Sequence, residues 1–186
     1  MYEKHRIAVV IPAYNESAFI EGTIENVPPF VDLIAVVDDG STDSTAALVE
    51  AMASTLPELT LLRHPHNQGV GRAITTGYRW ALQRGADIVV VMGGDGQMDP
   101  GDLPALLRPL LTSRVARWSY AKGNRLSHPS VWRVMPPVRL VGNIALSVLT
   151  RWATGLPTLW DSQCGYTAIR REALLAEARG EGRPFR

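Results

Sequence analysis

The sequence has only one cysteine, Cys164, and no apolar run long enough to cross a bilayer. A single cysteine excludes an intrachain disulfide and a cysteine-based zinc cluster, so we expect a reducing compartment, the cytoplasm. The most apolar stretch, LVGNIALSVL at 140–149, falls well short of the ~20 residues that span a membrane. Because Arg139 and Arg151 flank this stretch, it fits a buried helix or a helix on a membrane surface.

Acidic residues are missing from one third of the chain. Residues 103–160, the basic segment, contain eight Lys or Arg and no Asp or Glu, whereas residues 1–102 contain six Lys or Arg and 14 Asp or Glu. The basic segment also contains Trp118, Trp132, Trp152 and Trp160. Basic side chains interleaved with tryptophan suit anionic lipid headgroups or nucleic acid. The alternative is a solvated basic face with tryptophans in the core.

No GxGxxG turn follows the first apolar run, which argues against a dinucleotide-dependent dehydrogenase. Short aliphatic runs at 7–11, 33–37, 59–63 and 87–92 alternate with helical patterns at 16–26, 44–54, 71–83 and 102–111. This alternation predicts an α/β fold with a mostly parallel central sheet flanked by helices. Beyond residue 112 the pattern weakens to a strand at 119–123, a helix at 138–152, a short strand and a terminal helix from 171. The length suits one domain.

Acidic side chains follow each predicted strand except the third. The loops read PAYNE (12–16), DDGSTD (38–43), HPHNQGVGRA (64–73) and GGDGQMDP (93–100). Right-handed crossovers place these loops along one edge of the sheet, where open α/β sheets bind ligands. Carboxylates gathered there repel one another, so we expect a cation, a sugar hydroxyl or a basic partner among them.

Each loop also has a simpler interpretation. PAYNE fits a strand end followed by a helix that Asn15 caps, and DDGSTD fits an Asp-Gly turn followed by a helix that Asp43 or Ser44 caps. The NQGVG glycines fit a plain connection as well as a phosphate cradle. GGDGQMDP fits a hairpin turn, a metal site or a reduced metal site. His64 and His66 flank a proline, which is typical of loop residues, and we expect no metal role for them.

Five motifs together resemble family 2 glycosyltransferases of the GT-A fold, and among these the polyprenyl- or dolichyl-phosphate sugar synthases. They are VVIPAYNE, AVVDDGSTDST, NQGVGRA, GDGQMDP and DSQCGYTAIRREAL, and they extend over about residues 7–176. The resemblance implies a single Rossmann-like domain with a nucleotide-binding half at about 1–112 and an acceptor-binding half at about 113–179. It implies inverting transfer of a sugar from GDP-mannose or a UDP-sugar to a polyprenyl or dolichyl phosphate.

The resemblance also assigns the donor site. It implies that Pro12, Ala13, Tyr14, Glu16, Asp38 and Asp39 hold the base and ribose, with Arg72 approaching the donor. Asp95 and Gln97 would hold Mg²⁺ or Mn²⁺ against the diphosphate, because hard cations prefer oxygen ligands. Gly93 stands where the family usually has a further acid, so one anionic ligand is missing.

The acceptor side falls in the basic segment and just after it. The resemblance implies that Arg125 and Arg139 contact the acceptor phosphate and donor diphosphate, with Asn143 and Gln163 beside them. Asp161 would orient the acceptor, or act as the base if the acceptor were a hydroxyl. We expect a peripheral protein at the cytoplasmic face of a membrane, either a short form or a truncated piece, with no nucleic acid partner. The alternatives are a family 2 enzyme that glycosylates a saccharide or small-molecule hydroxyl, and a non-catalytic nucleotide or nucleic-acid binding module.

Overall fold

The structure is a computed structural model that describes residues 1–111, 118–124, 137–155 and 160–179. The chain forms two compact units, one comprising Met1–Ala121 and the segment that begins at Tyr166, the other comprising Lys122–Gly165. The first unit contains β1 (Ile7–Ala13), α1 (Ile20–Glu25), β2 (Leu33–Asp38), α2 (Thr45–Ala53), β3 (Leu59–Arg63), α3 (Val70–Gln83), β4 (Ile88–Val91), η1 (Pro100–Asp102), α4 (Leu103–Leu111), β6 (Thr167–Arg170) and α7 (Arg171–Ala178). Strand β5 (Tyr120–Lys122) lies at the boundary, and α6 (Pro137–Thr154) belongs to the second unit.

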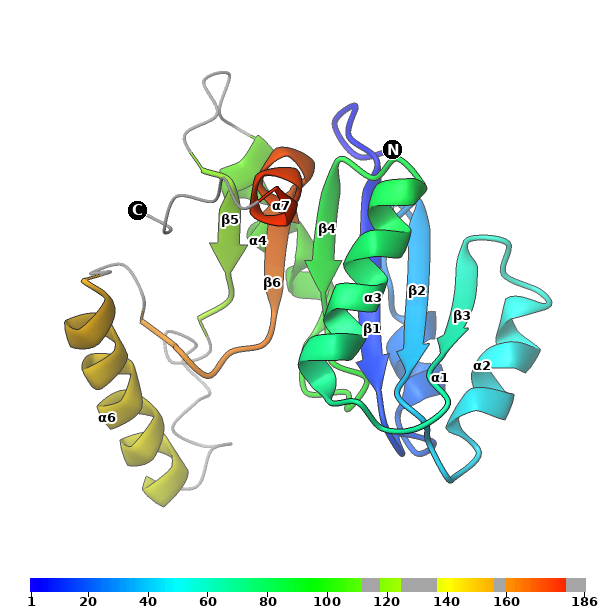
Figure 1. Cartoon of the computed structure of the whole chain (residues 1–186), viewed down its shortest axis with the longest axis horizontal. Helices are drawn as coiled ribbons and strands as arrows, with labels where there is room; N and C mark the ends of the chain where they lie inside the picture. Colours follow the sequence, from blue (N-terminus) through cyan, green and yellow to red (C-terminus); the bar gives the residue numbers. More distant parts are fainter. Residues whose placement is uncertain (112–117, 125–136, 156–159, 180–186) are drawn as a thin grey trace. The chain divides into compact units, whose positions relative to one another are not determined.

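The six strands form one sheet in the order β3-β2-β1-β4-β6-β5 (Figure 1). β1 pairs in parallel with β2 and β4, and β2 pairs in parallel with β3. β6 pairs antiparallel with β4. The predicted α/β class with a mostly parallel sheet is therefore correct. Because β1 lies between two parallel neighbours, the loops after β1, β2 and β4 meet at one edge, next to the point where the strand order reverses.

One apolar cluster of the first unit lies between the sheet and α3. Ala8 and Val10 of β1 are fully buried in one apolar cluster with Ala73 and Trp80 of α3. The helix approaches β1 so closely that a Cβ added at Gly77 would lie 2.1 Å from Val10 Cγ1. Only a glycine permits this approach, which fixes α3, and the loop that precedes it, against the sheet.

The first helix begins later than the sequence pattern predicts. α1 begins at Ile20 rather than near Glu16, and Asn15 does not cap it. Asn15 has a φ of 57° and its side chain accepts a hydrogen bond from Thr42 N instead. A long-range bond therefore overrides the local capping preference. The second helix begins where expected, with Ser44 at the N-cap position, and Asp43 Oδ1 accepts from Thr45 N (3.0 Å).

Candidate active site

The loop after β1 and the loop after β2 are joined by hydrogen bonds from the backbone of the first to side chains of the second. These bonds run from Asn15 N to Ser41 Oγ (3.0 Å), from Glu16 N to Thr45 Oγ1 (2.9 Å) and from Ser17 N to Asp43 Oδ2 (3.2 Å). In the opposite sense, Thr42 N donates to Asn15 Oδ1 at 2.8 Å. PAYNE and DDGSTD therefore form one braced surface, which lowers the ordering cost of binding a ligand there.

Asp39 is a buried carboxylate that the chain surrounds with donors. His64 Nδ1 lies 2.6 Å from Asp39 Oδ1, and Gln68 N donates to the same oxygen at 3.0 Å. Gly69 N donates to Asp39 Oδ2 at 2.8 Å. Burial alone would raise the pKa of Asp39, but the hydrogen bonds from His64, Gln68 and Gly69 together bring it below its ordinary value. The carboxylate is therefore ionised and holds the loop after β3 against the end of β2.

Asp38, the last residue of β2, is completely buried and only half satisfied. Its Oδ1 accepts from Ser41 N at 3.1 Å. Its Oδ2 has no hydrogen-bond partner among the described residues, although Arg63 Nε lies 3.6 Å away. The positive charge of Arg63 therefore offsets part of the cost of burying this oxygen, which has no hydrogen bond from the described residues.

Negative charge gathers where the loops after β1, β2 and β4 meet. Burial raises the pKa of Glu16, and the charges of Asp95 and Asp43 raise it further. The pKa of Asp43 itself is lowered, because hydrogen bonds from Thr45 and Ser17 outweigh the effect of desolvation. Within the described ranges, no three His, Cys, Asp or Glu side chains come together as a complete metal site.

The loop after β4 presents Asp95 and Gln97 on a short turn. Gln97 N donates to Asp95 Oδ1 at 3.1 Å, and Gly93 N donates to Met98 Sδ at 3.2 Å. A Cβ added at Gly93 would lie 3.1 Å from Asp95 Oδ1, so a side chain here would point at the carboxylate. A Cβ added at Gly94 would contact Ala13 and Ile20 at 3.4 Å, which shows how tightly this loop packs on the first.

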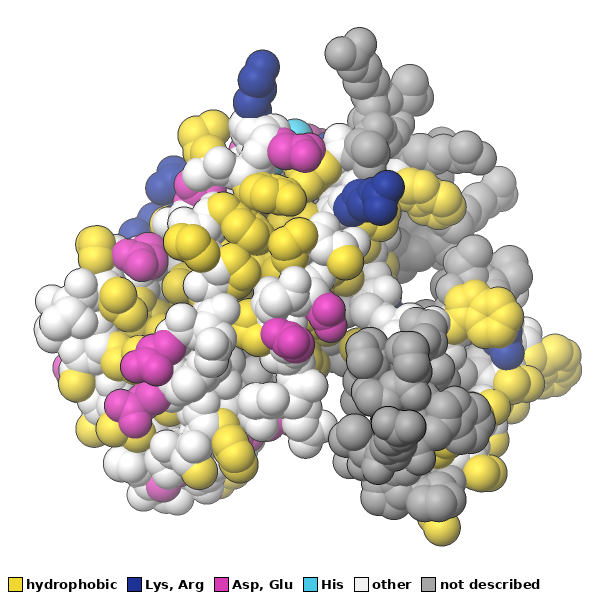
Figure 2. Space-filling model, turned by 180° about the vertical axis from the view of Figure 1, so that it is seen from behind, with side chains coloured by type: hydrophobic (Ala, Val, Ile, Leu, Met, Phe, Trp, Pro, Cys, Tyr) yellow, Lys and Arg dark blue, Asp and Glu magenta, His cyan; other side chains and the backbone are white. Residues whose placement is uncertain are grey.

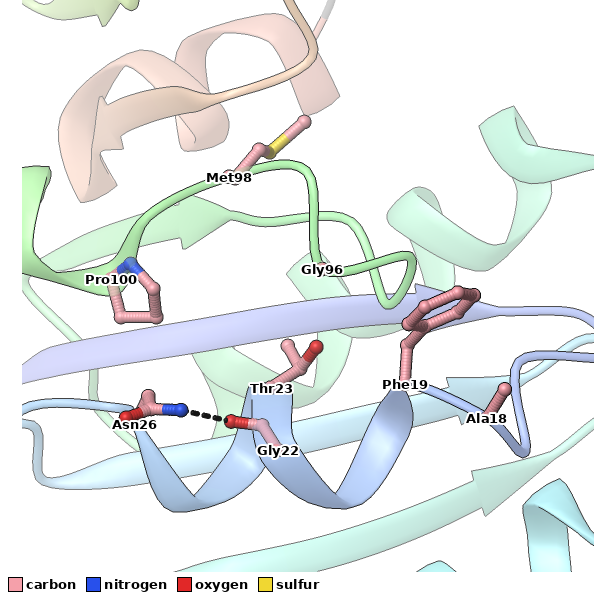
Figure 3. A pocket seen from close by; sticks show the side chains of 8 residues that line it. All are labelled: Ala18, Phe19, Gly22, Thr23, Asn26, Gly96, Met98 and Pro100. Carbon is pink, nitrogen blue, oxygen red and sulfur yellow. Dashed lines mark hydrogen bonds between the residues drawn. The ribbon is translucent and has the colours of Figure 1, made fainter.

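A pocket of about 260 Å³ opens on the other side of this loop, between the loop and α1 (Figure 3). Its lining consists of Ala18, Phe19, Gly22, Thr23, Asn26, Gly96, Met98 and Pro100. The amide of Asn26 is occupied by a hydrogen bond to Gly22 O at 2.7 Å. None of the residues expected to hold the donor lines this pocket, so it is distinct from the acidic edge.

Two further donor-side residues are exposed near the same edge. Tyr14 follows directly after β1 and has 43% of its surface exposed. Arg72 is exposed in the first turn of α3, where Arg72 N donates to Gly69 O at 2.9 Å. The loop that Asp39 holds therefore leads directly into the turn that carries Arg72.

In the second unit, α6 supports the DSQCG loop. Ser147, almost fully buried on α6, accepts from Ser162 N at 3.1 Å, and Lys122 Nζ bonds to Cys164 O. Asp161 is 2% exposed, and its Oδ1 accepts from Gln163 N at 3.0 Å. Asn143 lies half-buried on α6, one turn before Ser147. Arg125 and the side chain of Arg139 lie outside the described residues.

The outer surface of α6 is apolar. Val141, Leu149 and Trp152 are 67%, 57% and 84% exposed, whereas Leu140 and Ser147 are buried. Figure 2 shows hydrophobic side chains along this helix. The acidic side chains visible in that view lie on the first unit. No helix in the described part of the chain is long and apolar enough to cross a membrane.

His64 is the residue whose role the sequence did not reveal. The proline beside it suggested an ordinary loop histidine, but the structure buries its ring between Asp39 and Thr76. The signal available was its place directly after β3, at the same edge as the other loops. Its partners lie 25 and 12 residues away in sequence, so only the fold brings them together.

Comparison with known proteins identifies the family. Residues 8–176 match the model of glycosyl transferase family 2. The chain is 32% identical over 181 residues to the UDP-N-acetylglucosamine–dolichyl-phosphate N-acetylglucosaminyltransferase of Methanococcus voltae, covering 90% of this chain and 70% of that one. It is 33% identical over 175 residues to the undecaprenyl-phosphate mannosyltransferase of Micrococcus luteus, covering 92% and 69%. The chain therefore belongs to glycosyltransferase family 2, which confirms the predicted family and enzyme class.

Comparison with solved structures gives a result consistent with this family. The mannosyltransferase PcManGT of Pyrobaculum calidifontis, solved in complex with GDP-Man and Mn²⁺, superposes with a TM-score of 0.61 at 24% identity. The match covers 96% of this chain and 48% of that one, so this chain spans about half the length of that structure. The GT-A fold is thereby established, as the sequence predicted.

Proposed function

We propose that this chain transfers a sugar, with inversion, from a nucleotide-sugar such as GDP-mannose or a UDP-sugar to a polyprenyl or dolichyl phosphate. One observation carries the proposal: the relatives from M. voltae and M. luteus are named for different sugars but share a polyprenyl-type phosphate acceptor. The basic segment supports it, since eight Lys or Arg without one acid suit a phosphate-bearing acceptor.

The braced edge of the first unit would take the nucleotide. The exposed ring of Tyr14 offers a stacking face for a base. The remaining acceptor capacity of Asp39 Oδ2 suits an N–H or hydroxyl group of a base or ribose, and Asp38 would support this oxygen from the end of β2. Glu16, with the backbone of Pro12 and Ala13, would complete the wall, and Arg72 would approach the diphosphate.

Asp95 and Gln97 fit a hard divalent cation, Mg²⁺ or Mn²⁺. They supply two oxygen ligands on one turn, and the charges of Asp95 and Asp43 add to the rise that burial causes in the pKa of Glu16, which is the kind of setting that attracts a cation. Mg²⁺ is typically held by one or two carboxylates together with substrate phosphates, which matches a site with a single Asp. A cation bound there would neutralise charge on the departing nucleoside diphosphate.

Attack by a phosphate acceptor does not require a strong general base. A phosphate monoester is already ionised at neutral pH, so its oxygen can attack the anomeric carbon directly, which inverts that carbon. Arg125 and Arg139 would hold the acceptor phosphate, with Asn143 and Gln163 beside it. Asp161 is buried and accepts from Gln163 N, which favours an orienting role over that of a general base.

The acceptor's lipid would lie where α6 meets a membrane. The exposed apolar side of α6 and the absence of acids in the basic segment together fit an anionic lipid surface. We place the protein at the cytoplasmic face of the membrane. Co-sedimentation with phosphatidylglycerol vesicles, and weaker sedimentation with phosphatidylcholine vesicles, would support this; Trp152→Ser should reduce binding to both.

The reaction is tested with a donor panel and a short polyprenyl phosphate. GDP-mannose, UDP-glucose and UDP-N-acetylglucosamine are each incubated with the protein and the acceptor, with and without EDTA, and lipid-linked sugar is measured. We expect one donor to give product and EDTA to abolish it. Transfer to soluble saccharides that Asp161→Asn removes, with none to the lipid phosphate, would instead show a hydroxyl acceptor.

Variants separate the two substrates. Arg125→Ala and Arg139→Ala should each abolish transfer and leave nucleotide binding intact. Arg151→Ala is the matched control, because it removes a positive charge from the same segment while its guanidinium contacts only the Trp160 ring in the described structure (4.6 Å). Unchanged transfer in both Arg125 and Arg139 variants would overturn the acceptor assignment.

A further inference from the structure

We propose that His64 is a positioning residue for donor binding, which acts through Asp39 on the loop between β3 and α3. The inference deepens the proposed function and rests on the donor site described there. It concerns a side chain that the sequence pattern assigned to an ordinary loop.

The His64 ring is held at both nitrogens. Nδ1 lies 2.6 Å from Asp39 Oδ1, and Nε2 lies 2.9 Å from Thr76 Oγ1 on α3. The two ionisable side chains are 9% and 5% exposed. An ionised carboxylate can only accept hydrogen bonds, so His64 Nδ1–H donates to Asp39 Oδ1. In the neutral ring, Nε2 then accepts from the Thr76 hydroxyl. The ring therefore links the end of β2 to α3.

Asp39 also binds the backbone of the loop between β3 and α3. Among the described residues, its Oδ1 accepts from both His64 and Gln68 N, whereas its Oδ2 accepts only from Gly69 N. A carboxylate offers about four lone-pair sites in all. With Oδ1 occupied by His64 and Gln68, Oδ2 is the oxygen with capacity left for a ligand.

The loop between β3 and α3 also packs directly on the loop after β2. A Cβ added at Gly40 would lie 2.6 Å from the carbonyl carbon of His66, so the two loops are in direct backbone contact. Gly69, at a φ of 90°, ends the loop and accepts from Arg72 N. The orientation of Asp39 and the start of the helix that carries Arg72 are thus fixed together, and removing His64 would loosen both.

Nucleotide binding tests this without any acceptor. Affinities for GDP and UDP with Mn²⁺ are measured by calorimetry on His64→Leu, His64→Asn and Thr76→Val. His64→Leu removes both bonds, His64→Asn keeps a donor near the Nδ1 position, and Thr76→Val removes only the second bond. His66→Asn is the matched control, because His66 is an exposed histidine of the same loop.

We expect His64→Leu to weaken nucleotide binding about tenfold and to raise the donor KM similarly with kcat within about twofold, as for loss of a hydrogen bond to a charged group. His64→Asn should recover most of the affinity, and Thr76→Val should lose about threefold. His66→Asn should match wild type.

Wild-type affinity in His64→Leu would overturn the inference, as would equal loss in His64→Leu and His64→Asn. If His64→Leu does not fold, the nucleotide affinities of Thr76→Val and His64→Asn test the inference instead. Failure of the wild type to bind either nucleotide would overturn the donor site and this inference with it, whereas tight binding without lipid glycosylation would overturn only the proposed acceptor.

Discussion

Glu16 and Asp95 stand on different loops, 79 positions apart in the sequence, yet they share one electrostatic environment. Burial raises the pKa of Glu16, and the charge of Asp95 is the next contribution. The two loops also pack closely, because a Cβ added at Gly94 would lie only 3.4 Å from Ala13 and from Pro12 O. The edge of the sheet is therefore prepared for positive charge by its own side chains.

The first prediction concerns pH and Glu16. Because the folded pKa of Glu16 is raised above its ordinary value of 4.5, the folded state favours the protonated form. Ionised Glu16 therefore lowers stability as pH rises through the raised pKa, and it has no effect well below 4.5. Glu16→Gln should be more stable than wild type at about pH 7, by less than about 1 kcal/mol because the group retains solvent contact, and equal at about pH 3.5.

Urea unfolding at the two pH values measures this difference. Glu21→Gln, an exposed acid of α1, is the control for removing a negative charge from this region, and it should gain less stability at about pH 7 than Glu16→Gln does. A difference between Glu16→Gln and wild type that stayed the same at both pH values would contradict the account.

The second prediction concerns Gly93. Gly93→Asp would add a second carboxylate beside Asp95, and affinity of such sites rises with the number of charged ligands. We expect Mn²⁺ to bind about tenfold more tightly in the presence of the nucleotide, measured by calorimetry. Gly93→Ala is the control for crowding, since any Cβ here lies 3.1 Å from Asp95 Oδ1. Unchanged Mn²⁺ affinity in Gly93→Asp would show that Asp95 is not a ligand.

The architecture of this edge follows from local sequence signals. Aliphatic runs that lead into PAYNE, DDGSTD and GGDGQMDP predict strands with loops at one edge. β1 ends within the first motif, β2 ends at the first residue of the second, and β4 ends just before the third. Burial of both sheet faces makes such runs continuous rather than alternating, which is why the strands are readable. The start of α1 was not predicted, because Asn15 bonds to Thr42 on another loop.

The third prediction concerns Asp39. Asp39→Asn would turn an amide group toward the donors His64, Gln68 and Gly69, and should cost about 2 kcal/mol at neutral pH. The pKa of Asp39 is lowered, so its stabilisation is present above its ordinary value of 3.8 and is lost as pH falls through the lowered pKa. The stabilities of the wild type and of Asp39→Asn should therefore become equal in acid. Asp102→Asn, an exposed acid, is the control; equal losses in both variants would contradict the prediction.

The fourth prediction concerns the approach of α3 to β1. Gly77→Ala would place a methyl group 2.1 Å from Val10 Cγ1 and should cost about 3 kcal/mol or more. Gly71→Ala, in the same helix, meets nothing within 4 Å and should be neutral or stabilising by up to about 1 kcal/mol. Thermal unfolding compares the two. Similar stabilities would show that α3 does not pack this closely.

The features that the sequence left hidden depend on tertiary contacts. His64 meets Asp39 and Thr76 only after β2, β3 and α3 have assembled. The unpartnered Oδ2 of Asp38 likewise depends on what surrounds the end of β2, including the distance to Arg63. Residue types predict which side chains can do chemistry, whereas their partners and protonation depend on packing across the sheet.

A competition between two acceptors shows whether the acceptor is a lipid phosphate. The protein is given its preferred donor, Mn²⁺ and equal amounts of a short polyprenyl phosphate and the corresponding polyprenol, and the glycosylated lipids are separated and quantified. The account predicts product from the phosphate alone, with loss of that product in Arg125→Ala and Arg139→Ala. Glycosylation of the free polyprenol, or of neither lipid while a soluble sugar is glycosylated, would contradict it.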